Sequence, residues 1–163
     1  MKTAICPGSF DPITLGHLNI IRRTANIFDE VVVLVMSNAS KKNPMFTIEE
    51  RIDMVERVVS RFDNVKVKHY GGLLADFAKE YNWPIIVKGL RAGTDFESEF
   101  QMAQVNKIIN PNFETMFLTS SEKYTFISSS VVKEIAAYGA DLKELVPREI
   151  IKDIEAKARL GRK

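Results

Sequence analysis

Five short runs with the pattern of a β-strand, four of them apolar and the third alternating, are each followed by a segment of helical periodicity, and they constrain the fold of this chain more than any other feature. The runs are Thr3–Cys6, Val31–Val35, Val65–His69, Pro84–Val87 and Thr115–Leu118. The second run is unbroken and β-branched, which is typical of a strand buried on both faces of a parallel sheet. Parallel strands need crossover connections, which are usually helical and right-handed. The alternation therefore predicts an α/β fold: a doubly wound, five-stranded parallel sheet with helices on both faces.

Local signals place the starts of several helices. Thr47 and Glu50 form a T-x-x-E capping box, in which each residue satisfies a free backbone donor near the other. Thr94 or Asp95 can cap a helix that stops before Pro111, and the hydroxyls of Ser128–Ser130 suit a further helix start. These signals support the alternation of strands and helices.

The length of the chain fits one domain. It has 163 residues, enough for a full core, and we find no internal repeat, linker or low-complexity tract. We therefore expect a single Rossmann-like domain over residues 1–163. Its last helix should cover about residues 147–158, because Pro147 suits a first helical turn, and a charged tail should follow.

Charge and cysteine content narrow the class of protein. Lys and Arg number 23 against 21 Asp and Glu, a balance that argues against a nucleic-acid partner. The single cysteine, Cys6, suits a reducing compartment. Residues 1–6 are too short for a signal-peptide core, and no apolar run approaches membrane-spanning length. We expect a cytoplasmic protein without a membrane partner.

The first strand-to-helix connection, Pro7–His17, is unusually rich in glycine and proline. Gly8 allows a close approach to the backbone, and Gly16 removes a side chain just before His17. A helix with Leu18 on its apolar side should start here, and its free N–H groups favour an anion. A lone histidine in this place is more simply explained as a helix cap, so the other loops must decide between binding and structure.

Cations and hydroxyls follow four of the five predicted strands, where ligands of open α/β sheets bind. They are Ser9 and His17 after the first strand, Lys41 and Lys42 after the second, Lys88 and Arg91 after the fourth, and Lys123, Tyr124 and Ser128–Ser130 after the fifth. We expect Ser9, Lys41, Lys88 and Ser129 on one rim. Their convergence predicts an anion site, and polyphosphate is the favoured anion.

Signatures of several other enzyme classes are missing from the sequence. It has no G-x-x-x-x-G-K-[ST] loop of the P-loop NTPases and no G-x-G-x-x-G fingerprint of dinucleotide binding. It has no G-x-S-x-G elbow of serine hydrolases and no Cys/His cluster for zinc. We therefore expect no metal-ligating residues in the chain itself.

Two motifs resemble those of the nucleotidylyltransferase superfamily. The segment Gly8–Pro12 with Thr14–His17 resembles its [TH]-x-G-H motif, and Ile127–Lys133 resembles its I-S-S-[ST]-x-x-[KR] signature. Within the superfamily, the chain from about Ala4 to Pro147 is similar to the bacterial phosphopantetheine adenylyltransferases. The similarity also includes the blocks Ser40–Lys42, Met45–Thr47, Glu49–Arg51, Gly89–Arg91 and Asp95–Glu97.

The resemblance implies transfer of AMP from ATP to 4′-phosphopantetheine, with Mg²⁺ as cofactor and a homohexamer as the assembly. It implies ATP contacts at Ser9, Phe10, His17, Gly89, Leu90, Arg91, Glu99, Tyr124, Thr125, Phe126, Ile127, Ser128, Ser129 and Ser130. It implies acceptor contacts at Ser9, Lys41, Leu74 and Lys88. It gives catalytic roles to His17 and Lys41. Lys88 stands where the family usually has Arg.

The residue types suit such a reaction. An acceptor phosphate is already an anion, so positioning and charge neutralisation suffice without a general base. His17 would donate a hydrogen bond that strengthens in the transition state, and Arg91 would hold the leaving pyrophosphate. Two alternatives remain open. One is a related enzyme with nicotinate mononucleotide or glycerol 3-phosphate as acceptor, and the other is a non-enzymatic nucleotide-sensing module.

Overall fold

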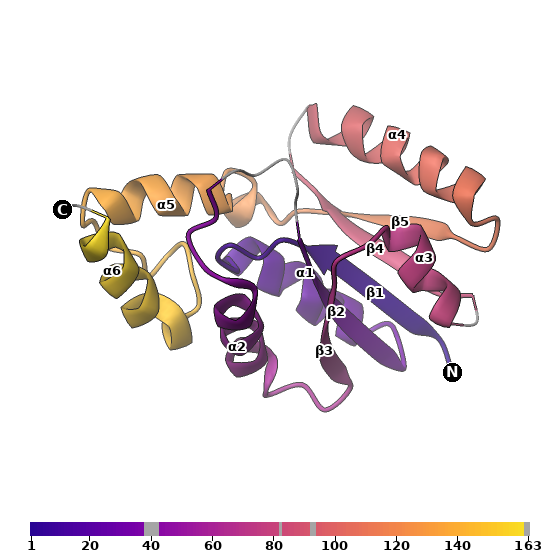
Figure 1. Cartoon of the computed structure of the whole chain (residues 1–163), viewed down its shortest axis with the longest axis horizontal. Coiled ribbons are helices and arrows are strands. Elements are labelled where there is room, and N and C mark those ends of the chain that lie inside the picture. The colour runs from indigo at the N-terminus through magenta and orange to yellow at the C-terminus, as the bar shows by residue number, and fades with distance from the viewer. Residues whose placement is uncertain (38–42, 82, 92–93, 162–163) are drawn as a thin grey trace.

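A five-stranded parallel sheet of order β3-β2-β1-β4-β5 forms the centre of the computed structural model, which describes residues 1–37, 43–81, 83–91 and 94–161 (Figure 1). The strands are β1 (Thr3–Gly8), β2 (Glu30–Met36), β3 (Val65–Tyr70), β4 (Ile85–Leu90) and β5 (Glu114–Thr119). Every pairing is parallel, so the predicted doubly wound fold is confirmed. The winding direction reverses between β1 and β4, which makes their carboxyl ends the expected ligand site.

Helices and 3₁₀ turns connect the strands. They are α1 (Leu15–Ala25), α2 (Ile48–Val59), α3 (Leu74–Phe77), η1 (Ala78–Glu80), α4 (Thr94–Ile109), η2 (Glu122–Tyr124), α5 (Ser129–Ala137), η3 (Arg148–Ile150) and α6 (Ile151–Leu160). The predicted capping box of α2 is present, with Thr47 and Glu50 bonded reciprocally. Of the helices in the described ranges, none has the length and apolar character needed to cross a membrane.

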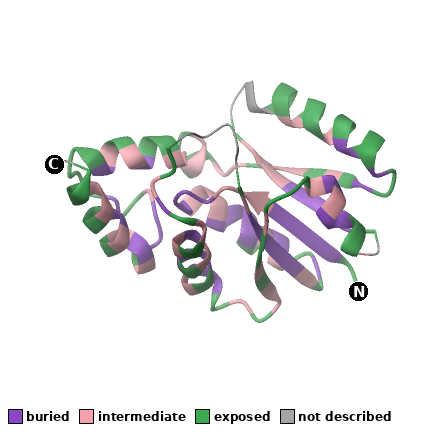
Figure 2. Cartoon of the chain, in the orientation of Figure 1, coloured by how far each residue is buried: buried purple, intermediate pink, exposed green. Residues whose placement is uncertain are grey.

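The two faces of the sheet are covered unequally (Figure 2). One face, which we call the closed face, packs against α1 and α2, and its larger apolar cluster, to which Val31 and Val33 of β2 belong, extends to α5 and α6. The other, the open face, packs against α3, η1 and α4; Val32 and Leu34 belong to its smaller cluster. Alternate residues of β2 thus enter opposite cores, as its unbroken apolar run predicts.

Helix α4 is sparsely covered by the rest of the chain. Among its residues from 96 to 109, Asn106 alone is buried. Its apolar side chains are largely exposed, from 40% for Ile109 to 82% for Ile108. The exposed set is Phe96, Phe100, Met102, Val105, Ile108 and Ile109. These residues are distributed around the helix rather than along one stripe, a pattern typical of a helix that is buried on several sides.

Candidate active site

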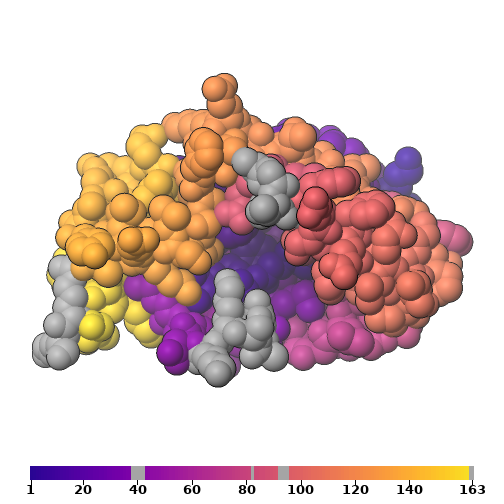
Figure 3. Space-filling view, turned by 90° about the horizontal axis from the view of Figure 1, so that it is seen from above, coloured from indigo at the N-terminus to yellow at the C-terminus, as the bar shows by residue number. Residues whose placement is uncertain are grey.

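A polar cavity of about 430 Å³ opens beyond the carboxyl ends of β1 and β4. Figure 3 shows the molecule hollowed between the orange segment that contains α5 and the red segment that contains α4, with the indigo N-terminal strand at the bottom of the hollow. Its walls come from the β1–α1 loop, the start of α1, the end of β4 and the start of α5. The cavity therefore lies where the strand order predicts a ligand.

Most of the predicted ATP residues line this first cavity. They are Ser9, Phe10, His17, Gly89, Arg91, Glu99, Tyr124, Ile127, Ser128, Ser129 and Ser130. Leu90, Thr125 and Phe126 do not line it, and Phe126 is 83% exposed. Lys41, predicted for both catalysis and acceptor binding, lies outside the described residues, as does Lys42. Of the four residues expected on one rim, Ser9, Lys88 and Ser129 do border the same cavity.

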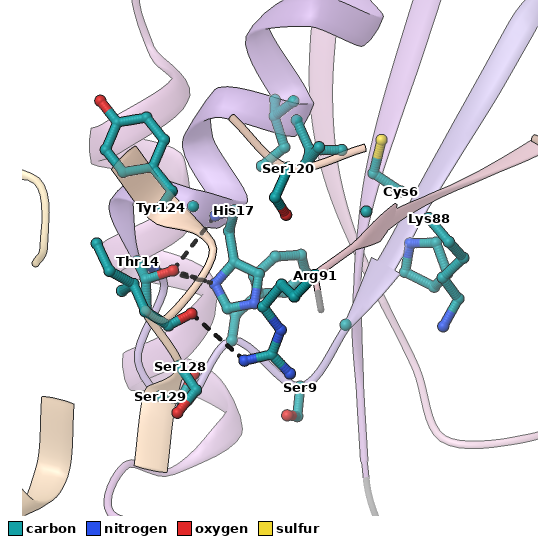
Figure 4. Close-up of a pocket in the computed structure, with 18 of the residues that line it drawn as sticks. Cys6, Ser9, Thr14, His17, Lys88, Arg91, Ser120, Tyr124, Ser128 and Ser129 are labelled. Atoms are coloured by element: carbon teal, nitrogen blue, oxygen red, sulfur yellow. Dashed lines mark hydrogen bonds between the residues drawn. The ribbon is translucent and has the colours of Figure 1, made fainter. Parts of the chain in front are cut away.

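His17 is held by the helix that carries it. Thr14 is the N-cap of α1 and His17 is its N3 residue, so the two form a capping box. The Thr14 amide donates to Nδ1 of His17 at 3.0 Å, and the His17 amide donates to the Thr14 hydroxyl at 3.3 Å (Figure 4). Since Nδ1 accepts a hydrogen bond from a backbone N–H, the proton of the neutral ring is on Nε2. The capping interpretation and the binding interpretation are thus compatible, because one nitrogen caps and the other remains a donor.

The ring of Phe10 packs against the ring of His17. The Phe10 backbone takes a φ of 46°, uncommon for a non-glycine residue, and its ring is buried with its centroid 5.2 Å from the His17 ring in an edge-to-face arrangement. A Cβ on Gly8 would lie 3.0 Å from the Phe10 ring. Gly8 thus permits a close approach, as the sequence predicts, and Phe10 is the group that approaches.

The serines at the start of α5 make different hydrogen bonds. Ser128 is the N-cap, and its hydroxyl accepts from the Val131 amide at 3.1 Å. The Ser129 hydroxyl donates to the Pro12 carbonyl at 2.8 Å, which joins the second motif to the first. The predicted helix start is confirmed. Because the hydroxyl of Ser129 is bonded within the protein, an anion here would meet mainly backbone N–H groups.

Two cations reach the cavities from the end of β4. Arg91 Nη1 donates to the Ile127 carbonyl at 3.4 Å (Figure 4), and Arg91 and His17 line the same cavity. Lys88 forms an ion pair with Glu99 of α4 at 3.2 Å, and both side chains are about two-thirds to three-quarters shielded from solvent. The predicted rim cation Lys123 is different: it pairs with Glu144 at 2.9 Å and lines neither cavity. The structure therefore does not bring Lys123 to either cavity, although its neighbour Tyr124 lines the first.

A second cavity of about 480 Å³ lies on the open face and is more apolar. It shares Ser9, Lys88 and Glu99 with the first, so the two meet at the strand ends. Sequence reasoning named only Leu74 among its other walls. The further lining residues include Met36, Leu73, Met102, Asn106 and Phe113. Glu99, Met102 and Asn106 are three and four residues apart, so they share one side of α4, but the apolar pattern of the helix does not single out that side.

Cys6 lines the first cavity but is not a reactive group. It is buried, and burial raises its thiol pKa to about 12. The thiolate that a nucleophile or metal ligand requires is therefore suppressed at neutral pH. The described residues also contain no group of three or more His, Cys, Asp or Glu side chains that could hold a metal ion.

Comparison with known proteins gives a consistent result. Residues 5–135 match the family model described as cytidylyltransferase-like. The chain is 50% identical over 157 residues, 96% of this chain and 95% of the relative, to a phosphopantetheine adenylyltransferase of Clostridium botulinum. It is 54% identical over 147 residues, 90% and 89% of the two chains, to the protein of that name from Dictyoglomus thermophilum.

A solved structure supports the fold. A Vibrio parahaemolyticus protein provisionally assigned as a nicotinate-nucleotide adenylyltransferase superposes with a TM-score of 0.68 over 96% of both chains, at 18% identity. At that identity the likeness concerns the fold alone. From the family model and the two close relatives together, the chain belongs to the phosphopantetheine adenylyltransferase family of the cytidylyltransferase-like proteins.

Proposed function

We propose that the protein transfers AMP from ATP to 4′-phosphopantetheine, giving dephospho-coenzyme A and pyrophosphate. The observation that carries this assignment is the meeting of two chemically different cavities at one sheet edge. Hydroxyls, helix-terminal amides and Arg91 suit a polyphosphate in the first cavity. Apolar side chains with one amide, Asn106, suit a long arm of methylenes and amides in the second.

The residues shared by the two cavities suit the place where the two substrates would meet. Lys88 and Ser9 stand where an acceptor phosphate would enter from the second cavity and meet the α-phosphate of ATP. An oxygen of the acceptor phosphate bonds to the α-phosphorus, and the bond to the bridging oxygen breaks, so that pyrophosphate leaves with the electron pair. The attacking oxygen is already anionic, and catalysis therefore requires alignment and charge stabilisation rather than a base.

His17 and Arg91 are the proposed charge-stabilising groups. The Nε2–H of His17, fixed by the Thr14 contact to Nδ1, donates to an oxygen on the α-phosphate as its charge grows. Arg91 and the N-terminus of α5 bind the departing pyrophosphate. Lys41 is proposed as a second catalytic cation. Further ATP contacts are proposed for Ser9, Phe10, Gly89, Leu90, Glu99, Tyr124, Thr125, Phe126, Ile127, Ser128, Ser129 and Ser130, and further acceptor contacts for Lys41 and Leu74.

Mg²⁺ is proposed to arrive with the nucleotide. Of the described residues that line the first cavity, Glu99 is the only carboxylate, and it pairs with Lys88. That donor set suits an ion held mostly by phosphates and water, which is the usual mode for Mg²⁺. Such an ion would neutralise part of the triphosphate charge. The chain itself would contribute Glu99. The cations beside Glu99 would limit how much phosphate charge the metal must balance.

The exposed apolar residues of α4 favour an assembly. We propose that the whole chain is one domain and that copies of it associate through α4 into a homohexamer, as the family resemblance implies. A helix that is apolar on several sides is stabilised when a second surface covers it. We also propose a cytoplasmic location, which suits the buried, unpaired thiol of Cys6, and small-molecule substrates rather than a nucleic acid.

Pyrophosphate release tests the function directly. Purified protein is mixed with ATP and Mg²⁺ and one of three acceptors: 4′-phosphopantetheine, nicotinate mononucleotide or glycerol 3-phosphate. We expect release with 4′-phosphopantetheine alone, together with dephospho-coenzyme A detected by mass. Release with either other acceptor would assign the chain to another reaction of the superfamily. ATP binding without release under all three conditions would favour a nucleotide sensor.

A further inference from the structure

The carboxylate of Asp11 is the most buried charged group of the described chain, and it lines neither cavity. It is 1% exposed. Its Oδ1 accepts from the Phe46 amide at 2.9 Å, and its Oδ2 accepts from the Met45 amide at 3.1 Å and from Lys133 Nζ at 2.5 Å. Every strong contact thus comes from a segment distant in sequence.

A second buried charge completes the cluster. Arg51, 5% exposed, lies with Nε 3.7 Å from Oδ1 of Asp11. The same Nε donates to the Phe46 carbonyl at 2.9 Å, and Nη1 donates to the Ser9 carbonyl at 3.2 Å. We call Asp11, Arg51 and Lys133 the Asp11 cluster. It holds two positive charges against one negative charge.

Burying such a group of charges in a protein core is energetically unfavourable. Taking a carboxylate and a guanidinium out of water costs several kcal/mol per ion before their attraction is counted, and an apolar replacement is often as stable. What an apolar contact does not provide is directional bonding to specific amides and carbonyls. The Asp11 cluster therefore favours a defined geometry over stability alone.

The segments joined by the Asp11 cluster are those that build the first cavity. Asp11 lies in the β1–α1 loop, two residues after Ser9. Lys133 lies in α5, whose first turn borders the cavity. Met45 and Phe46 lead into α2 and follow the predicted catalytic Lys41 by four and five residues in the sequence. The cluster thus connects the two sequence motifs to each other and to a third segment.

We propose that Asp11 is a positioning residue for adenylyl transfer, acting through Lys133 and the amides of Met45 and Phe46. By bonding α5 and the entry to α2 to one carboxylate, it fixes the distance between the His17 side of the first cavity and the α5 side. This role rests on the proposed function. Substrates tolerate small displacements of these walls, whereas the transition state does not. The effect therefore belongs to kcat rather than to KM.

The test compares Asp11→Asn with Asp153→Asn. Asp153 of α6 accepts two hydrogen bonds from Arg57 of α2, at 2.9 and 3.2 Å, and neither residue lines a cavity. Both substitutions keep the side-chain shape and remove a charge from an ion pair. We expect Asp11→Asn to lower kcat by roughly 10- to 100-fold, as a misplacement near 1 Å does, with KM for ATP within about threefold of wild type. Asp153→Asn should leave kcat within about twofold.

Lys133 provides the second variant, because Asp11→Asn itself could fail to fold. Lys133→Met should lower kcat to a similar degree, and Lys133→Arg, which keeps the charge, should restore much of it. If Asp11 and Lys133 act as a unit, the double variant Asp11→Asn/Lys133→Met should lose little more than either single variant. Independent, multiplied losses would refute the coupling.

Hydrogen exchange separates this role from the proposed function. In Asp11→Asn we expect faster exchange at the amides of Met45 and Phe46 and in the first turn of α5, and Asp153→Asn should not produce it. Unchanged exchange in these segments would overturn the positioning role, and so would normal kcat in a variant with faster exchange. If the wild type releases no pyrophosphate, the proposed function fails, and exchange still decides whether Asp11 holds the segments together.

Discussion

The two cavities use opposite faces of one sheet, and the faces differ in how completely the chain covers them. The first cavity takes walls from α1 and α5, which are anchored in the larger core by residues such as Leu18 and Val132. The second takes walls from α3, only four residues long, and from α4, which buries Asn106 alone among its residues from 96 to 109. The proposed nucleotide side therefore rests on the larger core, whereas the proposed acceptor side rests on a short helix and a largely exposed one.

Because of this difference, we expect substitutions on the two faces to change different properties of the protein. Changes on the closed face should act on the chemical step, since its groups are fixed by local hydrogen bonds such as the Thr14–His17 pair. Changes on the open face should act on the acceptor and on assembly. A substitution on one face that produced the effect expected for the other face would contradict this comparison.

The largest expected effect is on the closed face. We predict that His17→Ala lowers kcat by roughly 10²–10³, the usual loss for one transition-state donor, with little change in ATP affinity. Steady-state kinetics and ATP titration measure the two quantities. The matched control is Glu50→Ala, which removes the equivalent N3 partner from the capping box of α2. It should lower stability by about 1 kcal/mol, the usual value of a cap, and leave kcat unchanged.

Turnover of His17→Ala within a few-fold of wild type would leave His17 with its capping role alone. An equal fall in kcat for Glu50→Ala would mean that helix capping, rather than the Nε2–H donor, limits the reaction. Either result would contradict the prediction that groups on the closed face act directly on the chemical step.

The next effect tests the residues shared by the two cavities. Lys88→Ala removes a charged partner of the proposed acceptor phosphate, a bond worth about 1.5–3 kcal/mol. We expect a roughly 10- to 100-fold fall in kcat/KM for 4′-phosphopantetheine, with ATP affinity unchanged in the absence of acceptor. Lys107→Ala is the control, since Lys107 is also on the open-face side and pairs with Glu114 at 2.6 Å. A loss confined to ATP binding would show that Lys88 belongs to the nucleotide instead.

The sequence predicts those parts of this comparison that depend on local pattern. The five strands, the capping box at Thr47 and the helix start at Ser128 follow from periodicity and from side chains within three residues of each other. The covered and uncovered sides of α4 do not, because its apolar residues show no single stripe that would reveal which side faces the sheet. A pattern without a stripe indicates burial but not the burying surface.

Long-range ionic contacts were the main features that sequence reasoning missed. Lys133 and Asp11 are 122 positions apart, and no spacing rule connects such a pair. The same applies to the ion pair of Lys123 and Glu144. Cations after strands identify the edge of the sheet at which both cavities open, but not which of them line a cavity: Lys88 and Arg91 do, and Lys123 does not.

A smaller effect is expected on the open face. Ile108 of α4 is 82% exposed, and Ile108→Lys should prevent the proposed association by placing a charge in a covered apolar surface. We expect a lower mass in analytical ultracentrifugation and a rise of a few-fold in KM for 4′-phosphopantetheine, with ATP affinity unchanged. Ile27→Lys is the control, because Ile27 is 58% exposed and follows α1. An unchanged mass for Ile108→Lys would remove α4 from the interface.

The smallest effect concerns the outer edge of the closed face, where α6 is bound to α2. Lys157 Nζ contacts both carboxylate oxygens of Glu50 at 2.7 and 2.9 Å. This contact, followed by the bond from the Thr47 amide, lowers the pKa of Glu50 below its ordinary value of 4.5. A carboxyl whose pKa is lower in the folded state stabilises the fold above its unfolded pKa and loses that contribution as the pH falls through the folded pKa. Because the Glu50 side chain is 41% exposed, solvent screens the pair and the contribution stays near 0.5 kcal/mol.

Glu50→Gln isolates this charge, because glutamine can still complete a capping box. We expect the variant to unfold in urea with a free energy about 0.5 kcal/mol lower than wild type at pH 7. The difference should shrink as the pH falls below 4.5, where wild-type Glu50 takes up a proton. Lys157→Met should show the same pH dependence, since it removes the other half of the pair. A difference that persists unchanged in acid would trace the loss to the altered cap, and α6 would then be held to the closed face by apolar packing alone.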